Sequence, residues 1–178
     1  MHKAPNALYK EKYVNKQAIL LLYDYNYWAN RRILGMCAQV PREQFVATGA
    51  HGHSDLRGTL LHTLDTEYGW RMLCQHGQGT PVLEAADFPT PHALEQRWHA
   101  EEQAMRAYLS KLDDADLAGV IRYTADSGEP RERVLWHCLL HVLNHGTQHR
   151  SEAAVRLTEL GYSPGDLDFT VFLNEQLR

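Results

Sequence analysis

Four long segments with apolar side chains at every third or fourth residue constrain the fold of this chain more than any other feature. They run from Asn15 to about Gln39, from Ser54 to about Gln75, from Thr90 to about Leu112, and from about Glu132 to Leu160. This spacing places the apolar side chains on one face of a helix. Four amphipathic helices joined by polar connections predict an all-α fold, specifically an antiparallel four-helix bundle.

The connections carry the usual helix and turn signals. Ser54 is expected to cap the second helix and Thr90 the third, with Pro91 at its first position. The acidic run 113–116 is expected to end the third helix, and Gly128 favours a short hairpin within 119–133. A short amphipathic helix is expected near 167–173, and residues 1–14 are expected to form a loose N-terminal arm. We therefore expect residues 1–178 to form a single domain.

Composition narrows the function classes. The chain has 178 residues and a net charge of −4, from 18 basic and 22 acidic side chains, so no broad cationic field favours nucleic acid. No apolar run approaches the roughly 18 residues needed to cross a bilayer, so we expect no membrane partner and a cytoplasmic location. Cys37, Cys74 and Cys138 are few, odd in number and far apart, which indicates reduced thiols and not a disulfide framework.

Histidine is the unusual residue type, with 11 in the chain. Four of them lie in the last long helix at intervals of four residues: His137, His141, His145 and His149. A step of four residues rotates by about 40° around a helix, so these side chains form a slow spiral. On a helical wheel His145 and His149 lie beside the apolar stripe, whereas His137 and His141 lie farther toward solvent.

A pair of histidines at i and i+4 projects in one direction and can converge on a single metal ion. The residue after His145 is Gly146, so the glutamate of the His-Glu-x-x-His zinc proteases is missing. A third ligand should come from another helix, and His62, which lies mid-helix among leucines, is the best candidate. Two alternatives stay open: the pair could be an ordinary polar helix face, and His62 a hydrogen-bonded core histidine.

Neighbouring residues give further expectations. Gly146 inside a helix costs stability, which would be offset if another helix had to approach closely there. Arg150 falls on the apolar side of the wheel, so it should have a carboxylate or carbonyl partner. Asp65 and Thr66 share a face with His62 and could orient a bound ligand or water.

Three motifs resemble the DinB family of DinB/YfiT-like metalloenzymes: residues 25–32 (YNYWANRR), residues 56–62 (LRGTLLH) with the segment up to Trp70, and residues 141–150 (HVLNHGTQHR). The resemblance extends from about residue 17 to 175. It implies an antiparallel four-helix bundle, commonly a homodimer, that holds a divalent metal through His62, His145 and His149. Characterised relatives of this superfamily include S-transferases that use low-molecular-weight thiols and a thiol-dependent isomerase.

Three neutral imidazoles would leave the charge of a divalent ion uncompensated and so lower the pKa of a bound water or thiol. We therefore expect a metal-dependent enzyme that transfers a small thiol to an electrophilic small-molecule substrate, or a metal-hydroxide hydrolase. A non-catalytic, dimeric metal-binding module is the competing possibility. Zinc or nickel is favoured, and iron, manganese or copper is also compatible with imidazole ligands. The sequence identifies no further catalytic residue, and the paired Glu-x-x-His motifs of di-iron carboxylate bundles are absent.

Overall fold

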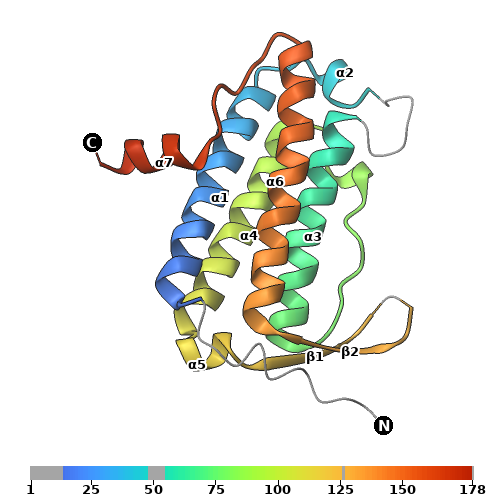
Figure 1. Cartoon of the computed structure of the whole chain (residues 1–178). Helices are drawn as coiled ribbons and strands as arrows, with labels where there is room; N and C mark the ends of the chain where they lie inside the picture. Colours follow the sequence, from blue (N-terminus) through green and yellow to red (C-terminus); the bar gives the residue numbers. More distant parts are fainter. Residues whose placement is uncertain (1–13, 48–54, 126, 178) are drawn as a thin grey trace.

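The computed structural model describes residues 14–47, 55–125 and 127–177. Most of these residues are helical, as predicted (Figure 1). The four long helices are α1 (Lys16–Cys37), α3 (Leu56–His76), α4 (Pro91–Lys111) and α6 (Leu135–Glu159). The shorter elements are α2 (Arg42–Phe45), η3 (Ala85–Asp87), α5 (Asp114–Leu117), β1 (Val120–Thr124), β2 (Pro130–Val134) and α7 (Phe169–Gln176).

Side-chain caps start the first three long helices. Asn15 caps α1, and Thr90 caps α4 as predicted, its hydroxyl accepting a hydrogen bond from the backbone N–H of Ala93. The cap predicted at Ser54 is wrong, and Ser54 itself lies outside the described residues. Asp55 takes this role, because its carboxylate is the one that accepts from the backbone N–H of Gly58 in the first turn of α3.

The region between α4 and α6 differs from the sequence-based boundaries in two places. The acidic run ends α4 as predicted, but it also forms α5, with a reciprocal capping box between Asp113 and Asp116. The predicted hairpin is present as the antiparallel pair β1 and β2, with Gly128 at φ +82° in the connecting turn. Since residues 130–134 pair with 120–124, α6 begins at Leu135 and not at Glu132.

The core lies between the long helices, which run side by side in Figure 1. The most extensive contact is between α3 and α6, and α1 also packs against α6. Two apolar clusters fill this core, one that includes Leu139 and one that includes Leu64, and both of these side chains are completely buried. The close contact of α3 with α6 matters for function, because these helices carry the predicted histidines.

The short helix α7 was expected from its amphipathic pattern. It packs against α1, where Phe172 contacts the ring of Trp28 at a centroid distance of 5.8 Å. Trp28 also donates a hydrogen bond of 2.7 Å from Nε1 to Glu175. These contacts hold the C-terminal segment against the outer side of the helical body.

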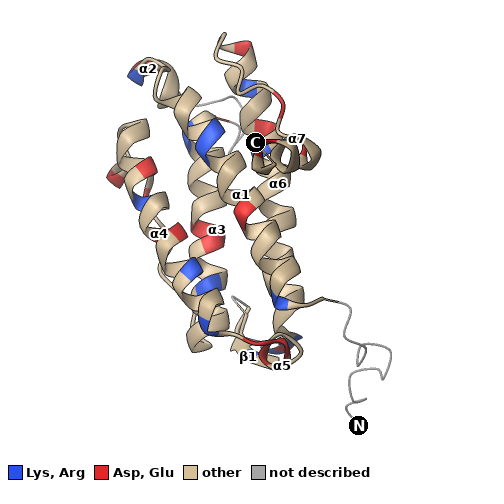
Figure 2. Ribbon diagram, turned by 90° about the vertical axis from the view of Figure 1, so that its left-hand side faces the viewer, with Lys and Arg blue, Asp and Glu red and all other residues tan. Residues whose placement is uncertain are grey.

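Charged residues of both signs are distributed over the helices in the view of Figure 2, and neither sign gathers on this face. Glu102 of α4 forms two ion pairs. The pair with Arg31 joins α4 to α1, and the pair with Arg106 lies within α4, one helical turn further along. Among the described residues, no helix is both long enough and apolar enough to cross a membrane.

Candidate metal centre

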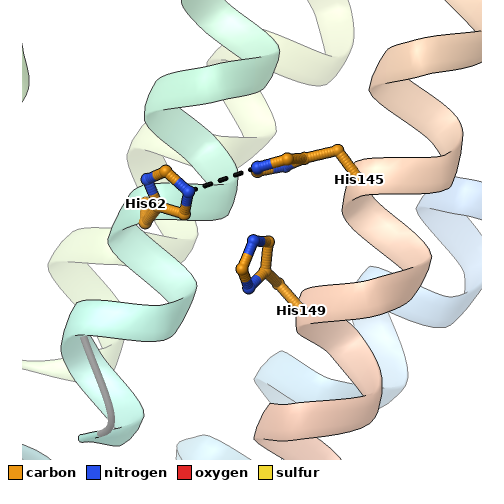
Figure 3. Close-up of side chains that lie close together, drawn as sticks. All are labelled: His62, His145 and His149. Carbon is orange, nitrogen blue, oxygen red and sulfur yellow. Dashed lines mark hydrogen bonds between the residues drawn. The ribbon is translucent and has the colours of Figure 1, made fainter. Parts of the chain in front are cut away.

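Helices α3 and α6 bring His62, His145 and His149 together. One nitrogen from each ring lies within 4.8 Å of the corresponding nitrogens of the other two. The Nε2 atoms of His62 and His145 are 3.2 Å apart, and the ring of His149 faces both (Figure 3). The ring centroids are separated by 4.4 to 4.9 Å. The three histidines expected to act together therefore do lie together.

This geometry fits a shared metal ion. Metal–nitrogen bonds of about 2.0–2.1 Å place two ligand nitrogens on one ion roughly 2.8–3.4 Å apart, for angles between octahedral and tetrahedral values. The separation of 3.2 Å between His62 and His145 falls within that interval. The other pairs of nitrogens lie no more than 4.8 Å apart, and side-chain rotation can bring them into the same interval. The donor set is entirely imidazole, as suits a divalent transition metal.

The surroundings of His145 favour the neutral form of its ring. Burial, together with charge repulsion from the neighbouring His149 and His62, lowers the pKa of His145 to about 4. A neutral imidazole is the form that binds a metal ion. His145 is thus already in its ligating protonation state well below neutral pH.

Glu152 is a member of the site that the sequence analysis missed. Its carboxylate lies 2.7 Å from Nδ1 of His149. A carboxylate at this position accepts a hydrogen bond from the Nδ1–H group, so Nε2 of His149 keeps its lone pair toward the other two rings. The spacing of three residues along α6 was the available signal, since residues at i and i+3 meet on a helix surface.

Arg150 lies beside the cluster but points into the protein, where it is only 3% exposed. It donates to the side-chain oxygens of Asn26, Asn30 and Thr147. The expected carbonyl partner is therefore present in the form of two asparagine amides from α1. Gly146 makes this possible, because a Cβ there would lie 2.8 Å from Nη1 of Arg150 and 3.1 Å from Oδ1 of Asn26.

The remaining predicted neighbours lie apart from the three nitrogens or are engaged elsewhere. The ring of His141 contacts Trp70 at 5.0 Å and lies 5.9 Å from the ring of His145. His137 lies farther along α6 toward its N-terminus. One oxygen of Asp65 accepts a hydrogen bond of 2.9 Å from the backbone N–H of Leu83, so this carboxylate anchors the loop before η3.

The fold and this cluster define a class: a mostly helical protein with three histidines placed to bind one metal ion. Comparison with known proteins specifies it further. The sequence model of the DinB family matches residues 12–177, so the chain belongs to the DinB family. A curated relative, "Protein DinB" from Bacillus subtilis (strain 168), is 23% identical over 162 residues, which cover 85% of this chain and 91% of the relative.

Proposed function

We propose that this member of the DinB family is a metal-dependent enzyme whose single domain, residues 1–178, is an antiparallel four-helix bundle. A divalent transition metal, zinc or nickel by preference, would be held by His62, His145 and His149. The observation that carries the proposal is the convergence of the three imidazole nitrogens from two helices. Family membership adds independent support.

The residues of the chain have separate tasks in this proposal. His62 would hold the metal from α3, and His145 and His149 would hold it from α6, so that the ion would link the two helices that share the most extensive contact. Glu152 keeps the His149 ring in the ligating tautomer. When bound, such a metal supplies a positive charge that lowers the pKa of a small thiol or of water to near neutral.

The reaction that best suits this arrangement is transfer of a low-molecular-weight thiol to an electrophilic small molecule. Three neutral ligands leave the metal charge uncompensated, which favours an anionic nucleophile. A thiol is more readily ionised than water at neutral pH, and the resulting thiolate is a strong nucleophile. We further propose a cytoplasmic homodimer that requires neither nucleic acid nor membrane.

Metal content is the first test. We expect about one divalent ion per chain by plasma mass spectrometry, as one three-ligand site implies. The variants His62→Ala and His145→Ala should lose it, whereas His99→Ala should retain it. His99 is the matched control, because it lies on the exposed side of α4 and its ring nitrogen contacts Gln103. Full metal content in His145→Ala would place the metal elsewhere and refute the site.

Turnover is the second test. Metal-loaded protein is incubated with a panel of small thiols and a chromogenic electrophile, and the rate is compared with that of the His62→Ala variant. Thiol-dependent turnover that requires His62 supports the transferase. Hydrolysis of an ester without thiol would favour a metal-hydroxide enzyme instead. Binding of one metal ion that raises the melting temperature without either activity would favour a non-catalytic module.

A further inference from the structure

A pocket of about 390 Å³ lies at the end of the helical body where α3 ends and α6 begins, beside the β1–β2 hairpin (Figure 1). Small-molecule sites in proteins usually measure about 300–1,000 Å³, so this pocket suits a small ligand. Its wall is formed by residues of α3, β1, β2 and α6: Trp70, Tyr123, Arg133, His137, Cys138 and His141.

The pocket is a neighbour of the three-histidine cluster and not a part of it. None of the three clustered histidines is in its wall. The link is His141, which lies one helical turn before His145 on α6, with the two ring centroids 5.9 Å apart. Trp70, whose ring lies 5.0 Å from that of His141, is about two turns beyond His62 on α3. A ligand that contacts His141 would therefore have one end near the cluster.

The hairpin presents one of its two faces to this pocket. Side chains alternate between the faces of a strand, and the register pairs Ile121 with Arg133. Tyr123 and Arg133 therefore share a face and lie diagonally across the strand pair, within reach of one ligand. The ring of Tyr123 lies 5.6 Å from that of Trp70, so this face is the one turned toward α3.

The charge of the wall favours an anion. Of the described residues in this wall, Arg133 is the one with a permanent charge. Its Nη1 donates to the backbone carbonyl of Glu132 at 2.9 Å, which uses one of five N–H donors, and it has no carboxylate partner among the described residues. The Glu132 carboxylate is on the opposite face of the hairpin, where it accepts a hydrogen bond of 2.6 Å from Arg122. Histidine is neutral or positive, so the two histidines of the wall do not repel an anion.

The aromatic part of the wall favours a flat, apolar ligand body. The rings of Trp70 and Tyr123 meet edge to face at an angle of 71°, and both are partly exposed. Aromatic rings in such an arrangement offer faces and edges against which another flat group can pack. A single guanidinium beside these rings matches a ligand with one negative charge, and a carboxylate can bind to it through two parallel hydrogen bonds.

We propose that this pocket binds a small monocarboxylate with a flat, apolar body, whose carboxylate pairs with Arg133 and whose body lies against Trp70 and Tyr123. The catalytic meaning of this site rests on the proposed function: the electrophile that receives the thiol would be such a carboxylate, with its reactive end toward the three histidines. Arg133 would then determine substrate specificity without belonging to the metal centre.

Binding to the full-length, metal-free protein tests the site directly. The probes are trans-cinnamate and cinnamamide, which share a flat, apolar body but differ in charge, and binding is measured by isothermal titration calorimetry. We expect cinnamate to bind at least about fivefold more tightly, because its contact with the guanidinium is charge-assisted. Equal affinity for the two probes in the unmodified chain would overturn the proposal.

Two variants identify the source of this preference. Arg133→Gln should bind the two probes with equal affinity. Arg122→Gln is the matched control, because it removes the same charge from the same hairpin but on the opposite face and outside the pocket wall. It should keep the preference for cinnamate. Loss of the preference in both variants would indicate a diffuse charge effect and refute the assignment to Arg133.

The position of the probe is tested in the unmodified chain, which requires no variant to fold. Cinnamate should shift the backbone amide resonances of Trp70, Tyr123, Arg133 and His141 more than those elsewhere, and Trp70→Leu should weaken binding of both probes by a similar factor. Shifts centred on another part of the molecule would overturn the proposal. Since these measurements use neither metal nor thiol, carboxylate binding can fail while thiol transfer to another electrophile succeeds, and the reverse.

Discussion

Replacement of Arg150 by methionine should destabilise the protein far more than replacement of an exposed arginine would. Arg150 is 3% exposed and donates to Asn26, Asn30 and Thr147. Methionine fills a similar volume but donates nothing. The Nδ2 atoms of Asn26 and Asn30 already lack a partner among the described residues, so the variant would leave both amides entirely unpaired in the core.

The expected cost follows from these contacts. Leaving a buried acceptor unpaired costs about 1–3 kcal/mol, and two asparagine oxygens lose their donor. Relief of the desolvation of the guanidinium offsets part of this cost. Because two acceptors lose their donor and the offset is partial, we expect the free energy of unfolding to fall by about 3–5 kcal/mol. At roughly 2–4 °C per kcal/mol for a chain of this size, the melting temperature should fall by about 6–20 °C.

The assay is urea unfolding followed by circular dichroism, with metal-free protein so that ligand binding does not contribute. Arg156→Met is the matched control on the same helix. Arg156 is 45% exposed and pairs with Glu159, so its replacement should change the free energy of unfolding by no more than about 1 kcal/mol. A loss below about 1 kcal/mol in Arg150→Met would show that the buried network contributes little and would refute this reasoning.

Two further predictions concern α6. Gly146→Ala should destabilise by about 1–3 kcal/mol in the same assay despite the better helix propensity of alanine, because the new Cβ would meet Arg150 and Asn26. Gly35→Ala, where nothing lies within 4 Å of the added atom, should instead stabilise by about 0.4–1 kcal/mol, and a gain of stability at both positions would contradict the packing argument. The pKa of His145 is lowered to about 4, so the unfolded chain takes up a proton first as the pH falls below about 6.5. The free energy of unfolding of metal-free protein should therefore decrease between pH 6.5 and 4, and His145→Asn should reduce this decrease; an unchanged profile in His145→Asn would show that His145 is not its source.

Much of the helical structure follows from local sequence. The apolar spacing along 16–37 and 91–111 specifies amphipathic helices, and Thr90 starts one of them through a cap that involves only its own first turn. The predicted start of α6 near Glu132 is wrong, because residues 130–134 pair with 120–124 as strands. Apolar spacing along one segment carries no information about such contacts between strands.

The sequence by itself also determined that His145 and His149 project together, because a spacing of four residues fixes their relative direction on one helix. It could not determine that His62 meets them. That contact depends on how closely α3 packs against α6, which the side chains between the helices decide. Packing of α1 against α6 likewise gives Arg150 its asparagine partners, since directions within a helix are local properties whereas distances between helices belong to the folded core.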